Sequence, residues 1–151
     1  MQTRRVLLAL IAAVFFGGLV SSGNAADKKG GLFINLTTDD TWSAAKAILF
    51  AHDRVLKAGH TPVAIWMNVR AIYLIDKKRA SHVHGLMKRE GQSIQDMLSA
   101  FMKDGGSVIA CGACSEAAGL TQADFIDGVQ MGNPELVKGL LFDPNVKTLS
   151  W

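Results

Sequence analysis

The sequence predicts an α/β fold built on a parallel sheet, and three observations lead to it. Residues 32–36 and 63–67 are short, almost wholly apolar runs, as expected for strands that are buried on both faces. Between them, residues 41–58 have the length and the apolar spacing of a helix that packs on a sheet. A strand, a long helix and a strand with short connections form a right-handed βαβ unit. A later apolar run, residues 107–110, adds another buried strand.

The first 25 residues have the three parts of a secretory signal peptide. Arg4 and Arg5 form a positively charged start, residues 6–20 carry no charge, and small residues precede a cleavage site after Ala25. This predicts an exported, single mature domain of residues 26–151. The apolar run is short for a membrane span, and an uncleaved anchor is the alternative. We therefore expect a periplasmic or secreted protein without stable membrane association after cleavage.

Composition narrows the classes of partner. The chain has 151 residues, with 16 Lys and Arg against 13 Asp and Glu, a formal charge of +3. Removing the signal peptide takes away Arg4 and Arg5, so that 14 basic residues face 13 acidic ones and the charge falls to +1. Because the basic residues are dispersed among acidic ones, we expect no nucleic-acid partner. The loop after residue 36 lacks glycine and carries Asp39 and Asp40, whose negative charges would repel phosphate. We therefore expect no nucleotide-binding site and no cofactor.

The first helix and the segment after the second strand come next in the chain. The helix is expected to begin after residues 37–40, whose side chains can cap it, and to end at Gly59. Residues 68–75 are predicted as a loop with a short helix, or as an extra strand. Asn68 and Arg70 lie at the carboxyl end of the second strand, the edge at which open α/β sheets bind ligands, and are predicted pocket residues. A capping Asn and a solvated Arg are the alternatives.

Residues 76–91 are the most polar section of the chain and are expected to cross the surface, where they could cover a site. His82 and His84 lie two residues apart in this excursion. With Cys111 and Cys114 they offer four possible ligands for zinc or copper. Exposed histidines without a metal are the alternative, and we expect no metal.

The second half of the chain continues the alternation of helices and strands. Residues 93–103 have apolar side chains at the three- and four-residue spacing of a helix packed on a sheet, and Gly105 and Gly106 end that helix before the strand at 107–110. The expected remaining elements are a short helix at residues 121–126, a helix from its cap Asn133 to about residue 141, and an alternating edge strand at residues 146–151.

Both cysteines of the chain lie where the strand at 107–110 passes into a helix. Cys111 follows the strand and Cys114 comes three residues later, and Gly112 leaves room for another molecule to approach the sulfur. Free N–H groups and the positive end of a helix dipole favour thiolate over thiol at Cys111. Such a pair can close a disulfide, share a metal, or act as nucleophile and resolving thiol. An inert disulfide between buried cysteines is the simplest alternative.

The segment around the cysteines resembles the DsrE/DsrF-like family of bacterial sulfur-transfer proteins, which includes TusD. The resembling residues are the strand that ends in Cys111, the helix start after it, and the pair Gly119 and Leu120. The glycine pair before the strand and the short strand that closes the chain also fit. The resemblance covers residues 31–151 and implies a flavodoxin-like three-layer α/β domain with a mostly parallel sheet of about five strands.

The resemblance also implies a chemistry for the cysteines. Cys111 would accept sulfane sulfur as a persulfide and pass it on, as a sulfurtransferase or a sulfur carrier. Cys114 is not part of the TusD-type pattern, although some relatives have such a pair, and it would resolve the persulfide or exchange thiol for disulfide. The implied partners are a sulfur donor or acceptor protein, a small sulfur compound, and further copies of the chain in a trimer or hexamer. The sulfur relays of the family are cytoplasmic, so the signal peptide leaves the partner open.

Two other functions stand beside sulfur handling. The chain could be a binding module in which the cysteines form a structural disulfide, or hold a metal with His82 or His84. It could also be mainly an assembly unit whose apolar surface near Trp151 builds a homo-oligomer. A relay requires an accessible Cys111 with Cys114 within disulfide reach, whereas a structural bridge requires two buried sulfurs that resist reduction.

Overall fold

A computed structural model describes residues 29–82 and 91–151 of the chain. These residues contain one five-stranded sheet with the strand order β4-β3-β2-β1-β5, in which all neighbouring strands are parallel. The strands are β1 (Gly31–Leu36), β2 (Val63–Met67), β3 (Ser107–Ala110), β4 (Gln130–Met131) and β5 (Val146–Ser150). The α/β class and the parallel sheet of about five strands are confirmed.

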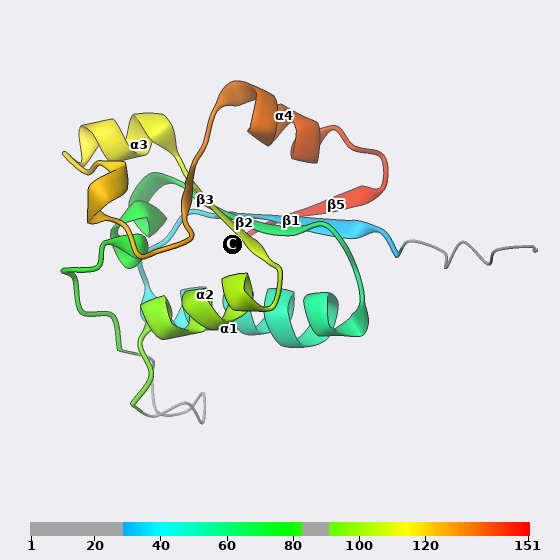
Figure 1. Cartoon of the computed structure of the whole chain (residues 1–151), viewed down its shortest axis with the longest axis horizontal. Helices are drawn as coiled ribbons and strands as arrows, with labels where there is room; N and C mark the ends of the chain where they lie inside the picture. The colour runs from blue at the N-terminus through cyan, green and yellow to red at the C-terminus, as the bar shows by residue number, and fades with distance from the viewer. Residues whose placement is uncertain (1–28, 83–90) are drawn as a thin grey trace, which may run out of the picture.

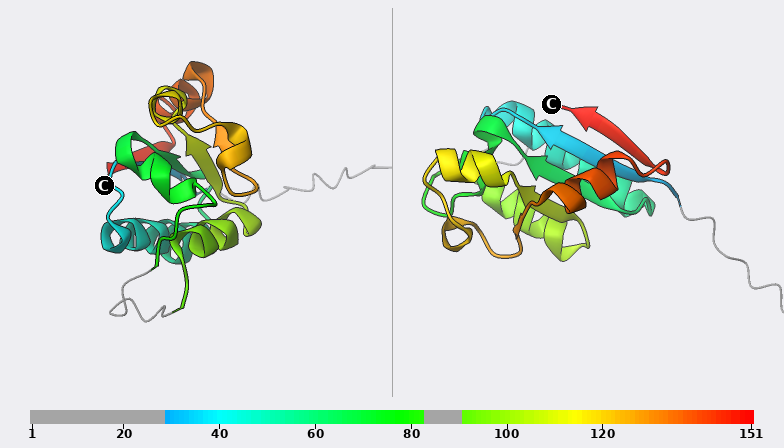
Figure 2. Two further views of the ribbon diagram at one scale, coloured as in Figure 1. Left: turned by 90° about the vertical axis from the view of Figure 1, so that its left-hand side faces the viewer. Right: turned by 90° about the horizontal axis from the view of Figure 1, so that it is seen from above.

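Helices cover both faces of the sheet, which gives the expected three layers (Figure 1). α1 (Thr41–Leu49) and α2 (Ile94–Lys103) lie side by side on one face, and α3 (Gly112–Ala117) and α4 (Pro134–Leu141) lie on the other. The same layers are visible from two further sides in Figure 2. The edge strand next to β1 is β5, whereas flavodoxin has its second strand there.

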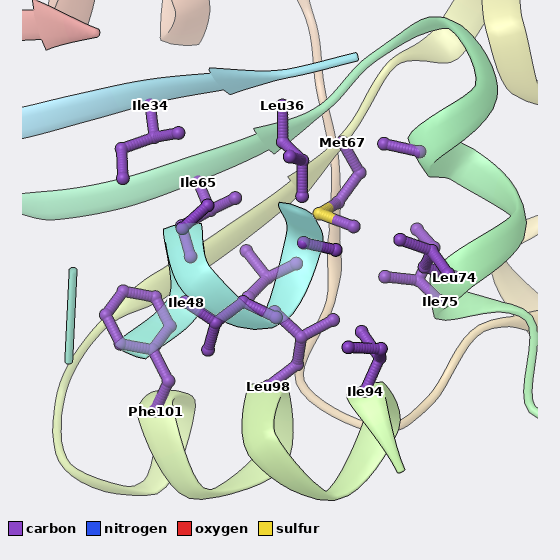
Figure 3. Close-up of a cluster of buried hydrophobic side chains, with 14 of the residues drawn as sticks. Ile34, Leu36, Ile48, Ile65, Met67, Leu74, Ile75, Ile94, Leu98 and Phe101 are labelled. Carbon is purple, nitrogen blue, oxygen red and sulfur yellow. The ribbon is translucent and has the colours of Figure 1, made fainter. Parts of the chain in front are cut away.

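The main core lies between the sheet and the helices α1 and α2 (Figure 3). Ile34 of β1 and Ile65 of β2 point toward these helices and are fully buried. Leu98 and Phe101 of α2 pack against the same cluster and are also fully buried. Strand side chains alternate between the two faces of a sheet. The residues next to Ile34 in β1 and next to Ile65 in β2 therefore face α4. The predicted apolar spacing of residues 93–103 therefore marks the side of α2 that contacts the sheet.

Capping side chains explain where the helices begin. The Asp40 side chain accepts a hydrogen bond from the N–H of Ser43 at the start of α1, at 2.8 Å. Ser93 and Asp96 form a reciprocal capping box at the start of α2. Asn133 accepts from the N–H of Leu136 at the start of α4. These side chains satisfy N–H groups that have no partner inside a helix, so the first residues of all three helices were predictable.

The first helical stretch is less regular than expected. It spans residues 41–58, as predicted, and Gly59 ends it with a left-handed backbone (φ 86°). The regular α-helix stops at Leu49, however, and the chain continues as a π-helix (Phe50–Val55) and a 3-10 helix (Leu56–Ala58). The wider π turn contains the buried His52, whose ring is hydrogen-bonded to the side chain of Asp104 just after α2. This tertiary contact is not visible in the local sequence.

Three further segments complete the comparison with the predicted elements. Residues 68–75 form a 3-10 helix, Val69–Ile75, and not an extra strand. The helix expected at residues 121–126 is a single 3-10 turn, Gln122–Asp124. β4 was not predicted, because a strand of two residues shows no alternating pattern in the sequence.

Some predictions fall on residues that the structure does not describe. The signal peptide and its cleavage site lie outside the described residues, and so do His84 and the rest of residues 83–90 in the polar excursion at residues 76–91. In the described part of the chain, no helix combines the length and the hydropathy that crossing a membrane requires.

Candidate functional site

The β3–α3 corner positions both cysteines at the carboxyl edge of the sheet. Cys111 directly follows β3 and is the N-cap residue of α3, with extended backbone angles (φ −66°, ψ 115°). Its Sγ accepts a hydrogen bond from the N–H of Cys114 at 3.2 Å. The Ser115 hydroxyl donates to the carbonyl oxygen of Cys111 at 2.7 Å, which fixes the first turn of the helix. The two sulfurs are joined in a disulfide, with the Cα atoms 5.2 Å apart.

The two sulfurs lie beside different hollows. Cys111 is 8% exposed and lines a cavity of about 320 Å³ together with Trp66 of β2 and with Val137 and Lys138 of α4. Cys114 is half-buried and lines a second hollow of about 410 Å³, on the side of the 3-10 helix Val69–Ile75. Cys111 is thus less exposed than a relay led us to expect, although its cavity gives a route to it.

Gly112 lines the Cys111 cavity, and its role in letting another molecule approach the sulfur stays a prediction. A Cβ atom at this position would lie 3.4 Å from the carbonyl oxygen of Gly132, an ordinary contact. Gly132 is more restricted, because a Cβ there would lie 2.7 Å from the carbonyl oxygen of Ala110. The close approach of the chain between β4 and α4 to the end of β3 therefore requires Gly132 more than Gly112.

Asn68 contacts the second cysteine directly. Its Oδ1 lies 3.2 Å from Cys114 Sγ and accepts a hydrogen bond from the N–H of Val69 at 2.9 Å. Its Nδ2 donates to Oδ1 of Asn35, near the end of β1, at 3.1 Å. Three neighbouring strands therefore contribute to one polar cluster: Asn35 on β1, Asn68 after β2 and the cysteines after β3. Asn68 is the N-cap of the 3-10 helix, which is the alternative of a capping Asn, and its role as a pocket residue stays a prediction.

The backbone of Val69 has an unusual conformation at this cluster. Its φ is +50°, in the left-handed region that β-branched residues rarely adopt, and the side chain is exposed. The Val69 N–H group lies 3.3 Å from Cys114 Sγ while it also donates to Asn68. Such a conformation costs on the order of 1–3 kcal/mol, and residues of this kind cluster at functional sites. Here it directs an N–H group at a sulfur atom.

Arg70 is held by an acidic partner and is not a free cation. Its guanidinium donates two hydrogen bonds to the carboxylate of Asp39, at 2.9 and 2.8 Å, and Arg79 donates a third at 3.1 Å. The hydrogen bond from Arg70 lowers the pKa of the Asp39 carboxyl group below its ordinary value. Arg79 also lies over the ring of Tyr73, 4.8 Å from its centroid. Arg70 and Tyr73 line the Cys114 hollow, so the predicted pocket residue is present there with its charge balanced.

The described residues give little basis for a metal site. His82 is exposed and pairs with Ser93 in an isolated bridge, and His84 lies among the residues that are not described. Within residues 29–82 and 91–151, no group of three or more His, Cys, Asp or Glu side chains is arranged to hold a metal ion.

Sequence reasoning missed Asn35, Val69 and Trp66. Asn35 is the one polar residue in the otherwise apolar run of residues 32–36, and this could have marked it. Trp66 faces the cavity of Cys111 and stacks on Phe33, with ring centroids 6.1 Å apart. No sequence signal marked the backbone conformation of Val69.

Comparison with known structures agrees with this fold. The crystal structure of the YchN protein from E. coli is similar, with a TM-score of 0.59 and 20% sequence identity, over 81% of this chain and 99% of that chain. MTH1491 from Methanobacterium thermoautotrophicum, a protein of unknown function, has a TM-score of 0.46 and 16% identity over the same shares. No protein-family model and no curated protein matches the chain. The likeness to YchN establishes a YchN-like fold.

Proposed function

We propose that the protein is an exported, sulfur-handling member of the DsrE/DsrF-like family, with Cys111 as the sulfur-accepting nucleophile and Cys114 as the resolving thiol. The YchN-like fold and the resemblance of the cysteine segment support the family. The observation that carries the chemistry is the cysteine pair at the β3–α3 corner, within bonding distance and with each sulfur beside a hollow.

The surroundings of Cys111 favour its role as nucleophile. Its Sγ accepts a backbone N–H at the N-cap position, and a hydrogen bond to the charged form stabilises a thiolate. The charged side chain that lines its cavity is Lys138, a cation. Glu116, an acidic residue of α3, is exposed to solvent. Activation of Cys111 therefore relies on lowering its pKa, not on a neighbouring base.

The proposed reaction has two steps, the uptake of sulfur by Cys111 and the release of hydrosulfide by Cys114. In the first, the Cys111 thiolate attacks the outer sulfur of a persulfide donor, a new S–S bond forms at Cys111, and the donor leaves as a thiolate. The sulfur can then pass to an acceptor thiol in the same way. In the second, the Cys114 thiolate attacks Cys111 Sγ of the protonated persulfide, so that hydrosulfide leaves with the electron pair and the Cys111–Cys114 disulfide forms. A dithiol reductant from outside the protein then restores both thiols.

A second candidate function is a binding module with a static disulfide. One observation favours it: Cys111 is buried, and Cys114 packs partly against the main core. In this case the hollows beside the sulfurs would hold a ligand and the disulfide would only brace the corner. The two functions differ in whether the disulfide can be reduced and the thiols react.

Mass spectrometry of the purified protein tests the proposal. The protein is measured without reductant and again after reduction and incubation with polysulfide, together with the variants Cys111→Ala and Cys114→Ala. We expect one or more sulfur atoms to be added to wild type. The addition should disappear in Cys111→Ala, and it should persist or increase in Cys114→Ala because the resolving thiol is missing.

The same measurement separates the two functions. Wild-type protein whose thiols are alkylated before incubation is the control for sulfur that is only adsorbed. If no form of the protein gains sulfur and the disulfide survives a dithiol reductant, the relay is wrong and the static module replaces it.

Export and assembly belong to the proposal as well. The signal-like residues 1–25 support a periplasmic or secreted location. N-terminal sequencing of the exported protein tests it, since the mature chain should start at residue 26.

A homo-oligomer is supported by exposed apolar side chains, among them Phe142, which is 75% exposed, and Leu149, which is 39% exposed. Light scattering measures the size of the oligomer. The proposed partners are a thiol protein or a small sulfur compound that donates or accepts sulfur.

A further inference from the structure

The two cysteines have different hydrogen-bond surroundings. Cys111 Sγ faces a donor, the N–H of Cys114, which favours the thiolate. Cys114 Sγ faces both the N–H of Val69, at 3.3 Å, and the side-chain oxygen of Asn68, at 3.2 Å. An oxygen that can only accept stabilises a protonated S–H group and opposes a thiolate. Reduction of the disulfide would thus leave Cys114 beside a hydrogen-bond acceptor, whereas the hydrogen bond that the described residues provide to Cys111 Sγ comes from a donor.

The orientation of the Asn68 amide follows from its neighbours. The Val69 N–H group can only donate, so the Asn68 atom that faces it at 2.9 Å is the oxygen. The amide nitrogen at the other end donates to Asn35 Oδ1 at 3.1 Å. Turning the amide over would break both hydrogen bonds. Asn35 and Val69 together therefore hold the Asn68 oxygen against Cys114.

We propose that Asn68, oriented by Asn35, keeps Cys114 protonated in the reduced protein and thereby delays its attack on a persulfide at Cys111. Asn68 is a positioning residue in this scheme, since it acts through the proton of Cys114. The delay gives an acceptor time to take the sulfur before hydrosulfide is lost. The delay rests on the proposed function, whereas the protonation states of the two thiols can be measured without it.

The charged and titratable groups around the cysteines leave this difference in place. Arg70 and Tyr73 line the Cys114 hollow, but both oxygens of the Asp39 carboxylate accept from Arg70, which offsets its charge. Lys138 lines the Cys111 cavity and favours a thiolate there. On α3 itself, Glu116 is exposed to solvent, where water screens it.

The test measures each thiol alone. Cys114 is followed in the Cys111→Ala protein and Cys111 in the Cys114→Ala protein, by the pH dependence of the rate of iodoacetamide alkylation, which reports the thiolate. Asn68→Ala removes the acceptor and leaves the Val69 N–H free to donate to Cys114. We expect the pKa of Cys114 to fall by about 0.5–1 unit, the size expected for one neutral hydrogen bond. The pKa of Cys111 should not change.

Asn68→Asp gives a change of opposite sign. Its carboxylate keeps an oxygen toward Cys114 and Val69, loses the hydrogen bond that the amide nitrogen donates to Asn35, and adds a negative charge, so the pKa of Cys114 should rise by about 1 unit. This near-isosteric variant also covers the case in which Asn68→Ala fails to fold. Asn145→Ala, in the turn before β5, is the matched control and should shift neither cysteine.

A functional readout completes the test in protein with both cysteines. After loading with polysulfide, Asn68→Ala should release sulfide about 3–10 times faster than wild type near pH 7, following its larger thiolate fraction. The proposal is overturned if neither Asn68 variant shifts Cys114, if Cys111 shifts equally, or if Cys114 shifts while sulfide release stays unchanged. If wild type takes up no sulfur, the proposed function fails, while the alkylation result still decides the protonation of Cys114.

Discussion

The face of the sheet under α1 and α2 and the face under α4 are covered to different depths. On the first face, Leu98 and Phe101 of α2 are completely buried in the large cluster of Figure 3. On the second, the buried cluster consists of four residues, and no residue of α4 is fully buried. The cavity of Cys111 opens on this second side, between β2, α3 and α4. The thickly covered face holds the fold together, and the thinly covered face leaves space for chemistry.

Trp66 illustrates the difference at the level of one side chain. It lies on the thinly covered face, and its enclosed Nε1 has no hydrogen-bond partner among residues 29–82 and 91–151. A buried donor that is left unpaired costs about 1–3 kcal/mol, and well-packed cores avoid such groups. The unpaired Nε1 therefore lowers the stability that Trp66 adds to the second face.

Leu98→Ala should have the largest effect on the free energy of unfolding, because it leaves a cavity in the thickly covered face. Leu98 is completely buried in α2, and a Leu→Ala change in such a core costs about 2–5 kcal/mol. Urea unfolding followed by circular dichroism measures the loss in free energy of unfolding. A loss below about 1 kcal/mol would contradict the assignment of this face as the main core.

Leu140→Ala makes the same chemical change on the other face. Leu140 of α4 is only half-buried against the small cluster, so we expect a loss of about 1 kcal/mol, well below that of Leu98→Ala. The same urea titration compares the two variants directly. Equal losses would mean that the two faces contribute alike to stability.

Asp124→Asn tests a polar contribution that, unlike the two apolar faces, depends on pH. Hydrogen bonds from the backbone and side chain of Thr121 lower the pKa of Asp124 to about 2. Because the folded pKa lies below the ordinary value of 3.8, this group stabilises the fold above about pH 4 and loses its effect as pH falls toward 2. Thermal unfolding should show the variant to be less stable than wild type at pH 6, with a gap that closes between pH 4 and 2. A gap independent of pH would assign the loss to something other than the charge.

Local patterns were sufficient to predict most of the framework. The apolar run at residues 63–67 gave a strand with the predicted bounds. The apolar spacing of residues 93–103 marked α2, and the cap Asn133 marked the start of α4, because a cap acts within three or four residues. The position of Cys111 between a strand and a helix followed from the same local reasoning.

The parts that could not be predicted depend on contacts between distant residues. The pairing of Arg70 with Asp39 joins residues 31 positions apart, and the contact of Asn68 with Cys114 spans 46. A strand pattern shows that Asn35 is polar, but not that its side chain contacts Asn68, which follows the neighbouring strand β2. The greater burial of Cys111 relative to Cys114 likewise depends on α4, which comes later in the chain. The corner was therefore predictable, and the hydrogen bonds that distinguish its two sulfurs were not.

The strand order also determines when the sheet can be completed as the chain folds. β5 pairs with β1, and their paired residues Gly31 and Val146 are more than 100 positions apart. Every neighbouring pair in this sheet is parallel, so no strand can pair with the next through a tight hairpin turn. Contacts of such long range slow folding, because the entropy of closing the loop is lost before the contact forms. One edge of β1 therefore stays unpaired until β5 has been synthesised, and until then an unfinished domain exposes the backbone N–H and C=O groups of that edge.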